Sequence, residues 1–299
     1  MPAAAFPTFH HRDFGAHVVA GMKGETTVSV CLPARDEART IGAIVATIRT
    51  ALVEAEQVVD EILVVDDHSE DRTAAVAAAE GARVVAAADV LPELDLGPGK
   101  GEAIWKSVFA ARGDVLVWCD ADVRDFDARF VLGLVGPLLA EPGLSFVKGF
   151  YDRPDEGGGR VTELVARPAL ALLFPPLTAI LQPLAGEYAA RREVVESLPF
   201  ARGYGVDLGL LVDAVRRFGT HAVAQVDLGS RLHRNRPLHE LVPQALRVLH
   251  TALARAGVRD ASEPAVLARP GHDPTRIEAG DLPPPVDVPE YERWPGRAG

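Results

Sequence analysis

Apolar and polar residues along the chain form blocks that predict strands and helices in turn. Residues 28–32 are a short apolar run that ends in a proline and a charged turn, which predicts a buried strand leading into a loop. Over residues 40–52, isoleucine and valine recur at helical spacing. A second strand over 61–67, an Ala-rich helix that stops at Gly81 and a third apolar strand follow. This order predicts a parallel βαβαβ unit.

The pattern continues through the middle of the chain and then becomes less regular. The later elements that it predicts are helices over about 103–111 and 237–257, a helix interrupted near Pro168, and strands over 114–119, 145–154 and 222–229. Continuous apolar strands are typical of a parallel sheet covered on both faces, so the fold class is α/β with helices on both sides. Because ligands collect at the carboxyl ends of such strands, the loops after Leu32, Val65 and Cys119 should converge on one crevice.

Composition and charge exclude several classes of function. The 299 residues include 42 acidic and 31 basic side chains, which gives a net charge of -11. A general affinity for nucleic acid or an anionic membrane needs a wide basic surface, so neither partner is expected. The longest apolar run, residues 169–181, contains two prolines and is too short to span a membrane. No secretory signal and no disulfide framework are evident, so we predict a cytoplasmic protein.

Two aspartates follow the fourth predicted strand, as Asp120-Ala121-Asp122. Extended backbone places residues i and i+2 on the same side, so both carboxylates can face one point. Two such groups suit Mg²⁺ or Mn²⁺ holding a diphosphate, since hard cations prefer oxygen ligands. The competing interpretation is an acidic turn that only ends the strand.

Two other strand ends carry polar groups of the same kind. Asp67 and Ser69 follow the second strand, where they could bind a nucleobase or a ribose hydroxyl or merely cap the next helix. Residues 97–101, Gly-Pro-Gly-Lys-Gly, open a helix, and their N–H groups with the Lys100 ammonium favour phosphate binding. A plain flexible loop is the alternative for this segment.

The second half of the chain contains two segments that favour small anions. Residues 231–236 hold three arginines, among them Arg231, with His233 available as a metal ligand beside Asp122. The glycine run at 157–159 leads to Arg160 and Thr162, which could close on a small phosphorylated acceptor or act only as a linker.

Taken in order, the motifs resemble those of one enzyme family. LPARDE, VVDDHSED, GPGKGEA, DAD, GGGRVTELVARP, LQPLAGEYAARR, GYGVDLGLLVD and HRNRP are similar to the glucosyl-3-phosphoglycerate synthases of actinobacteria and to the mannosyl-3-phosphoglycerate synthases, over about residues 28–257. The resemblance implies the nucleotide-diphospho-sugar transferase (GT-A) fold with a mainly helical acceptor part. It also implies transfer of a hexose to the 2-hydroxyl of 3-phospho-D-glycerate with retention of configuration, and a divalent metal, Mg²⁺ or Mn²⁺.

Position by position, the predicted site residues fall into four groups. Donor contacts are expected at Pro33, Ala34, Arg35, Glu37, Asp67, Ser69, Lys100, Asp120 and Ala121. Acceptor contacts are expected at Gly159, Arg160, Thr162, Arg231 and Asn235. The resemblance implies Asp122 and His233 as metal ligands, and the catalytic set is Asp122, Asp207 and Lys100. The resemblance also implies that Asp207 lies near the transferred sugar, at a position where the family usually has Glu, one methylene longer.

The organisation that we predict has four segments. They are an N-terminal extension (1–27), a nucleotide-sugar-binding half (28–140), an acceptor-binding half with its C-terminal helix (141–257) and a loosely packed Pro-rich tail (258–299). The donor is expected to be UDP-glucose, with GDP-mannose as the close rival, and the resemblance implies a homodimer.

Two other classes of function stay open at the level of sequence. A sugar-phosphate nucleotidyltransferase would need a glycine-rich loop with an arginine directly after the first strand, where this chain has Leu-Pro-Ala-Arg-Asp-Glu at 32–37. A non-catalytic nucleotide-sugar binding protein could act through the long helix over 237–257, although the intact carboxylates argue against it.

Overall fold

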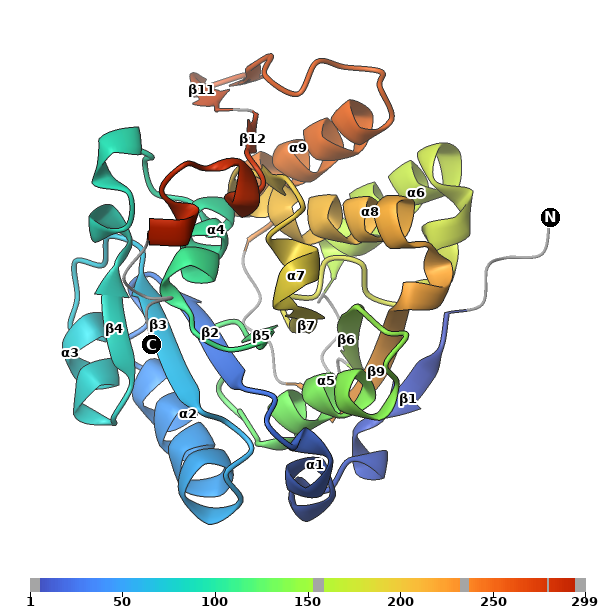
Figure 1. Cartoon of the computed structure of the whole chain (residues 1–299). Coiled ribbons are helices and arrows are strands. Elements are labelled where there is room, and N and C mark those ends of the chain that lie inside the picture. The colour runs from blue at the N-terminus through green and yellow to red at the C-terminus, as the bar shows by residue number, and fades with distance from the viewer. Residues whose placement is uncertain (1–5, 153–158, 232–236, 279, 294–299) are drawn as a thin grey trace.

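The computed structural model describes residues 6–152, 159–231, 237–278 and 280–293. In this part of the chain the central feature is an eight-stranded sheet (Figure 1). Its strands, in their order across the sheet, are β1 (Thr8–His10), β9 (Val223–Ser230), β6 (Phe146–Asp152), β7 (Tyr188–Arg191), β5 (Val115–Trp118), β2 (Val28–Ala34), β3 (Glu61–Asp66) and β4 (Arg83–Ala86).

Most of the sheet is parallel, as expected. β7 alone among these strands runs antiparallel, to both β5 and β6, and the other neighbouring strands pair in parallel. The sheet takes strands from both halves of the chain and from the N-terminal extension, because β1 pairs with β9 at one edge. The two halves are therefore joined through one continuous sheet.

Helices cover both faces, which confirms the α/β architecture. One face is covered by α1 (Ala16–Lys23), α2 (Ile41–Ile48), α3 (Thr73–Ala79) and α5 (Arg129–Ala140). The other is covered by α4 (Lys100–Ala110), α6 (Arg167–Leu173), α7 (Arg192–Val195), α8 (Val206–Phe218) and α9 (Leu238–Arg255). Successive strand residues enter opposite cores, with Cys31 in one and Leu32 in the other.

Two predicted helices differ from expectation at their ends. The helix expected over 40–52 is α-helical only to Ile48 and continues as a π-helix over Arg49–Ala55. Around Pro168, a π-helical turn at Thr162–Ala166 passes directly into α6. Pro168 follows this π-helical turn, whose wider i to i−5 hydrogen bonding, as from the Arg167 N–H to the Thr162 carbonyl, is a local departure from α-helical pairing beside the proline.

The prediction of a loosely packed tail is wrong for the described part of residues 281–291. After a hairpin of β10 (Ala265–Arg269) and β11 (His272–Ile277), strand β12 (Asp281–Leu282) pairs with β8 (Phe200–Ala201). Leu282 and Tyr291 are buried, and the Trp105 indole N–H donates to the Pro283 carbonyl over 2.7 Å. This segment completes the core over α4.

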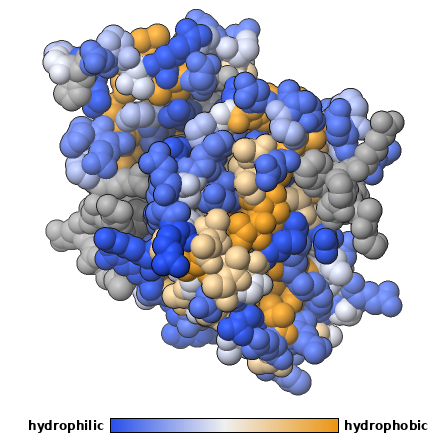
Figure 2. Space-filling model, turned by 90° about the vertical axis from the view of Figure 1, so that its left-hand side faces the viewer, coloured by the Kyte–Doolittle hydropathy of each residue, from blue (hydrophilic) through white to orange (hydrophobic). Residues whose placement is uncertain are grey.

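The side of the molecule at which β4 forms the sheet edge is mostly hydrophilic and carries a band of apolar residues (Figure 2). β4 is half-buried along its length, and α3 beside it exposes several alanines. Within the described residues, every helix is too short or too polar to cross a membrane.

Candidate active site

A cavity of about 680 Å³ lies where the loops after β2, β3 and β5 converge. Its lining includes Pro33 and Glu37 after β2, Asp67 after β3, and Asp120 and Asp122 after β5. The expectation of one crevice at the carboxyl ends of these strands is thus confirmed. The second half of the chain closes the cavity with residues that include those before α6, those at the start of α8 and those within α9.

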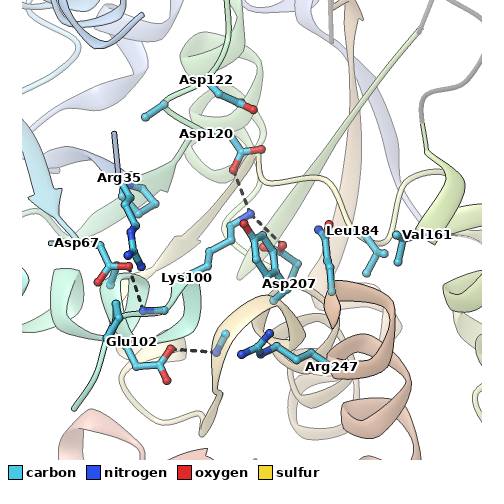
Figure 3. A pocket seen from close by; sticks show the side chains of 18 of the residues that line it. Arg35, Asp67, Lys100, Glu102, Asp120, Asp122, Val161, Leu184, Asp207 and Arg247 are labelled. Atoms are coloured by element: carbon cyan, nitrogen blue, oxygen red, sulfur yellow. Dashed lines mark hydrogen bonds and ion pairs between the residues drawn. The ribbon is translucent and has the colours of Figure 1, made fainter. Parts of the chain in front are cut away.

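Lys100 lies at the centre of the cavity, between two carboxylates (Figure 3). Its ammonium Nζ is 3.0 Å from Asp120 Oδ1 and 3.0 Å from Asp207 Oδ2. Burial acts to lower the pKa of Lys100, but Asp120 and Asp207 together raise it well above its ordinary value. Burial raises the pKa of Asp207, and Lys100 offsets part of that rise. Lys100 therefore stays charged, and the structure brings together three of the predicted residues.

A second ion network is centred on Arg231, which contacts both Asp120 and Asp122. Arg231 is buried, and its guanidinium contacts Asp122 Oδ1 at 3.0 Å and Glu187 Oε1 at 2.6 Å. It also donates to the Tyr151 hydroxyl over 2.8 Å and lies 3.5 Å from Asp120 Oδ2. Burial raises the pKa of Glu187 to about 6, against the opposing effect of Arg231.

This arrangement changes the interpretation of Arg231. It was expected among the acceptor contacts, yet it does not line the cavity with Gly159, Arg160 and Thr162, which do. The physical reason is charge, because four acidic or phenolic oxygens, from residues after β5, in β6 and before β7, surround its buried guanidinium. A role for Arg231 in binding the acceptor stays a prediction.

The nucleotide side of the cavity matches most of its predicted residues. Pro33, Ala34, Arg35, Glu37, Asp67, Lys100, Asp120 and Ala121 all line it. Ser69 does not, because its hydroxyl accepts the Asp36 N–H over 3.0 Å and so holds two loops together. Asp71, rather than Ser69, accepts the N–H of Thr73 at the start of α3, over 2.8 Å.

Asp67 connects the glycine-rich loop to the end of β3. Its carboxylate accepts the Gly99 N–H over 3.0 Å, and burial raises its pKa while His68 opposes the rise. One N–H that was expected to bind phosphate is therefore bound to the protein here. Gly97, Gly99 and Lys100 nevertheless line the cavity.

Sequence reasoning missed Glu187, Tyr151 and the residues of α9 that line the cavity. Glu187 precedes a four-residue strand, within a motif that was noted only as part of the ordered series. Its contact with Arg231 depends on the sheet order, so no local pattern could have shown it.

Two predicted site residues, His233 and Asn235, lie outside the residues that the structure describes. Among those that it does describe, no three His, Cys, Asp or Glu side chains are grouped closely enough to hold a metal ion. Asp122 lines the cavity, and the hydrogen bond that it accepts from Arg231 is at Oδ1. Oxygen donors of this kind fit Mg²⁺ or Mn²⁺.

Comparison with known proteins decides the family. Residues 29–196 match the model of glycosyl transferase family 2. Glucosyl-3-phosphoglycerate synthase from Petrotoga mobilis is 40% identical over 308 residues, covering 95% of each chain. The protein of that name from Mycolicibacterium smegmatis is 50% identical over 80% of each chain.

The chain belongs to the glucosyl-3-phosphoglycerate synthases of glycosyl transferase family 2. A solved member of these synthases, from Mycobacterium tuberculosis in complex with Mn²⁺, UDP-glucose and phosphoglyceric acid, matches with a TM-score of 0.87 and 45% identity, covering 94% of this chain and 98% of that one. Another structure of the same synthase, with Mg²⁺ and UDP, has a TM-score of 0.83 and 46% identity. The GT-A expectation is thus confirmed.

Proposed function

We propose that this chain transfers glucose from UDP-glucose to the 2-hydroxyl of 3-phosphoglycerate, giving glucosyl-3-phosphoglycerate. The observation that carries the proposal is the match to a synthase whose solved complex holds Mn²⁺, UDP-glucose and phosphoglyceric acid together. A further complex of that synthase holds UDP and glucosyl-3-phosphoglycerate. In this chain, residues expected to contact the donor and residues expected to contact the acceptor line one cavity with Lys100 and Asp207, which supports the proposal.

The charges of the cavity suit two anionic substrates. Asp122, with His233, would hold the metal ion, which when bound supplies positive charge to the leaving diphosphate. The Lys100 ammonium lies in the same cavity and is kept charged by its two aspartates, so it adds a second positive group. Arg160 and Thr162 also line the cavity, and a phosphate of the acceptor would bind to them.

In the transfer, the bond between the sugar C1 and the diphosphate oxygen breaks and a bond from C1 to the acceptor oxygen forms. The acceptor oxygen attacks C1 from the face that the diphosphate leaves, so the configuration is retained without an enzyme nucleophile. The acceptor hydroxyl proton passes to the leaving phosphate oxygen, which serves as the base. Asp207 is buried and forms an ion pair with Lys100, so it holds the Lys100 ammonium in position within the cavity.

A donor panel tests the proposal. UDP-glucose, GDP-glucose and GDP-mannose would each be mixed with 3-phosphoglycerate and Mg²⁺, and the products measured by mass spectrometry. We expect product from UDP-glucose at a rate well above the other donors. Faster transfer from GDP-mannose would replace the proposal with its mannosyl alternative, and no transfer from any donor would end it. Pairing of two copies also stays a prediction, which sedimentation of the purified chain would test.

Asp122→Asn gives the corresponding test of the metal site. We expect transfer to fall by at least about a hundredfold, because one ligand of the charge-stabilising metal is lost. Titration of Mn²⁺ in the presence of UDP should show weaker metal binding at the same time. Asp89→Asn, at an exposed position outside the cavity, is the matched control. Full activity of Asp122→Asn with an unchanged metal requirement would contradict this role.

A further inference from the structure

Helix α9 forms a wall of the cavity that none of the predicted site residues occupies. Leu241, Gln244 and Arg247 all line the cavity. They are three residues apart, so they lie along one face of the helix. The wall therefore presents one apolar side chain followed by an amide and a guanidinium.

The position of Arg247 is fixed by a close approach of α9 to the turn at Gly203–Gly205. A Cβ placed on Gly203 would lie 2.7 Å from Arg247 Nε, and the φ of Gly203 is +59°, a conformation that favours glycine. One turn farther along α9, Thr251 packs against Gly205 in the same way. The turn leads directly into α8 and Asp207, so Arg247 is held beside the centre of the site.

Gln244 and Arg247 are half-buried polar groups on the wall of the cavity. Within the described residues, neither side chain makes a hydrogen bond or an ion pair. Neighbouring Arg202 differs, because its Nε donates to Glu102 over 2.8 Å. Half-buried amide and guanidinium groups at a cavity wall can bind the oxygens of a ligand, which would take the place of water there.

The layout of the cavity indicates which part of a ligand lies there. In Figure 3, Arg35 and Asp67 lie on one side, Asp120 and Asp122 on a second, and Val161 and Leu184 on a third. On the proposed function, these sides belong to the nucleoside, the metal-bound diphosphate and the acceptor. Arg247 lies on the remaining side, across Lys100 and Asp207 from Asp122. The part of the donor without an assigned wall is its hexose.

We infer that Gln244 and Arg247 bind hydroxyl groups of the donor hexose and help to select it. The inference rests on the proposed function and adds the residues that recognise the sugar. A guanidinium donates to two hydroxyl oxygens at once, whereas an amide both donates and accepts. A wall of this kind distinguishes epimers, because a displaced hydroxyl leaves its partner unpaired.

The test compares binding of UDP-glucose with binding of UDP, in the presence of Mg²⁺, by calorimetry. Arg247→Met should weaken the binding of UDP-glucose about tenfold and change the binding of UDP by less than about twofold. The reason is that the hydrogen bond lost in this variant is one that a charged group makes to the sugar, which UDP lacks. Gln244→Met should act in the same direction with a smaller effect. Arg247→Lys should restore part of the binding. Arg112→Met, at an exposed arginine outside the cavity, is the matched control.

Three outcomes would overturn the inference. Equal weakening of UDP and UDP-glucose would place Arg247 at the nucleotide, and a rise in KM for 3-phosphoglycerate alone would place it at the acceptor. Unchanged binding of all ligands would leave only a packing role. Circular dichroism checks folding, and Gln244→Met carries the same test if Arg247→Met does not fold. Failure of the wild-type chain to transfer glucose would instead refute the proposed function.

Discussion

Lys148 is a buried cation beneath the site. It is 1% exposed, its ammonium donates to the Asp207 carbonyl over 3.4 Å, and it lies 4.4 Å from the centre of the Tyr188 ring. Burial lowers its pKa to about 8, with Asp207 opposing and Lys100 reinforcing the effect. The folded protein thus keeps this lysine charged at neutral pH at the expense of stability.

Lys148→Met should make the protein more stable at pH 7. The unfolded chain holds the lysine proton up to about pH 10.5 and the folded chain only to about pH 8, so the cost is complete below pH 8 and disappears as the pH rises to 10.5. The difference between these two pKa values corresponds to about 3 kcal/mol in the free energy of unfolding. Urea unfolding at pH 7 and at pH 10 measures it, and the gain should shrink at the higher pH.

A control for this prediction is Lys23→Met, whose ammonium pairs with Asp60 at 2.8 Å in a partly exposed position. Removing that pair should change stability by less than about 1 kcal/mol. If Lys148→Met were less stable than the wild type at pH 7, the charged lysine would be contributing stability, contrary to this account.

At the scale of single residues, the sequence predicted site residues that directly follow strands. It did not predict side chains that come into contact only because of the strand order in the sheet. Asp67, Asp120 and Asp122 could be predicted because the carboxyl ends of parallel strands share an edge. Glu187 and Arg231 could not, since their contact requires β7 to be inserted antiparallel between β5 and β6. Long-range pairing of that kind leaves no local pattern.

At the scale of elements, the glycine-rich loop contains two glycines with different constraints. A Cβ on Gly101 would collide with the carbonyl of Ala201, because the start of α4 packs directly on the strand and turn there. A Cβ on Gly97 would meet nothing within 4 Å. The sequence favours phosphate binding for this loop, but the structure assigns Gly101 to packing.

Gly101→Ala should therefore destabilise the protein by about 3 kcal/mol, the upper range for overpacking a rigid contact. Gly97→Ala, four residues away in the same loop, should change stability by less than about 0.5 kcal/mol. Thermal unfolding of the two variants side by side provides the measurement. Similar melting temperatures for both would show that α4 can shift without cost.

Sequence analysis missed several short elements and also the longer helices α1, α5 and α8, of which α5 contains Pro137, a residue that disfavours a helix interior. The segment Tyr204–Asp207 reads as a turn, yet α8 begins at Val206 within it. β1 has three residues and β7 four, too few for an apolar alternation to be recognised. By contrast, β2, β3, β5, β6, β9 and α9 follow strong local patterns and were predicted within a few residues.

At the scale of the whole molecule, the C-terminal segment helps to hold the fold. Tyr291 is 2% exposed, its ring lies 5.1 Å from that of Phe109, and its hydroxyl donates to Glu196 over 2.6 Å. Arg192 donates to the same hydroxyl over 3.4 Å. The segment thus packs on α4 and α7 from the side opposite the sheet.

Tyr291→Ala should cost about 3–5 kcal/mol of stability, as for other large aromatic side chains removed from a core. Tyr291→Phe keeps the ring and should cost only about 1 kcal/mol, the worth of the hydrogen bond. Urea unfolding of both variants separates the two contributions. A Tyr291→Ala protein as stable as the wild type would mean that the segment does not pack in solution.

The pairing of β1 with β9 also bears on how the protein is made. Thr8 lies opposite Gln225, and the cavity is lined by residues from Pro33 to Glu278. During synthesis, β1 therefore has no partner strand in the sheet until β9 has been made. Contacts so distant in sequence fold slowly, so the nascent chain exposes an unpaired sheet edge to chaperones. The cavity therefore has its full lining only after residues as late as Glu278 have folded.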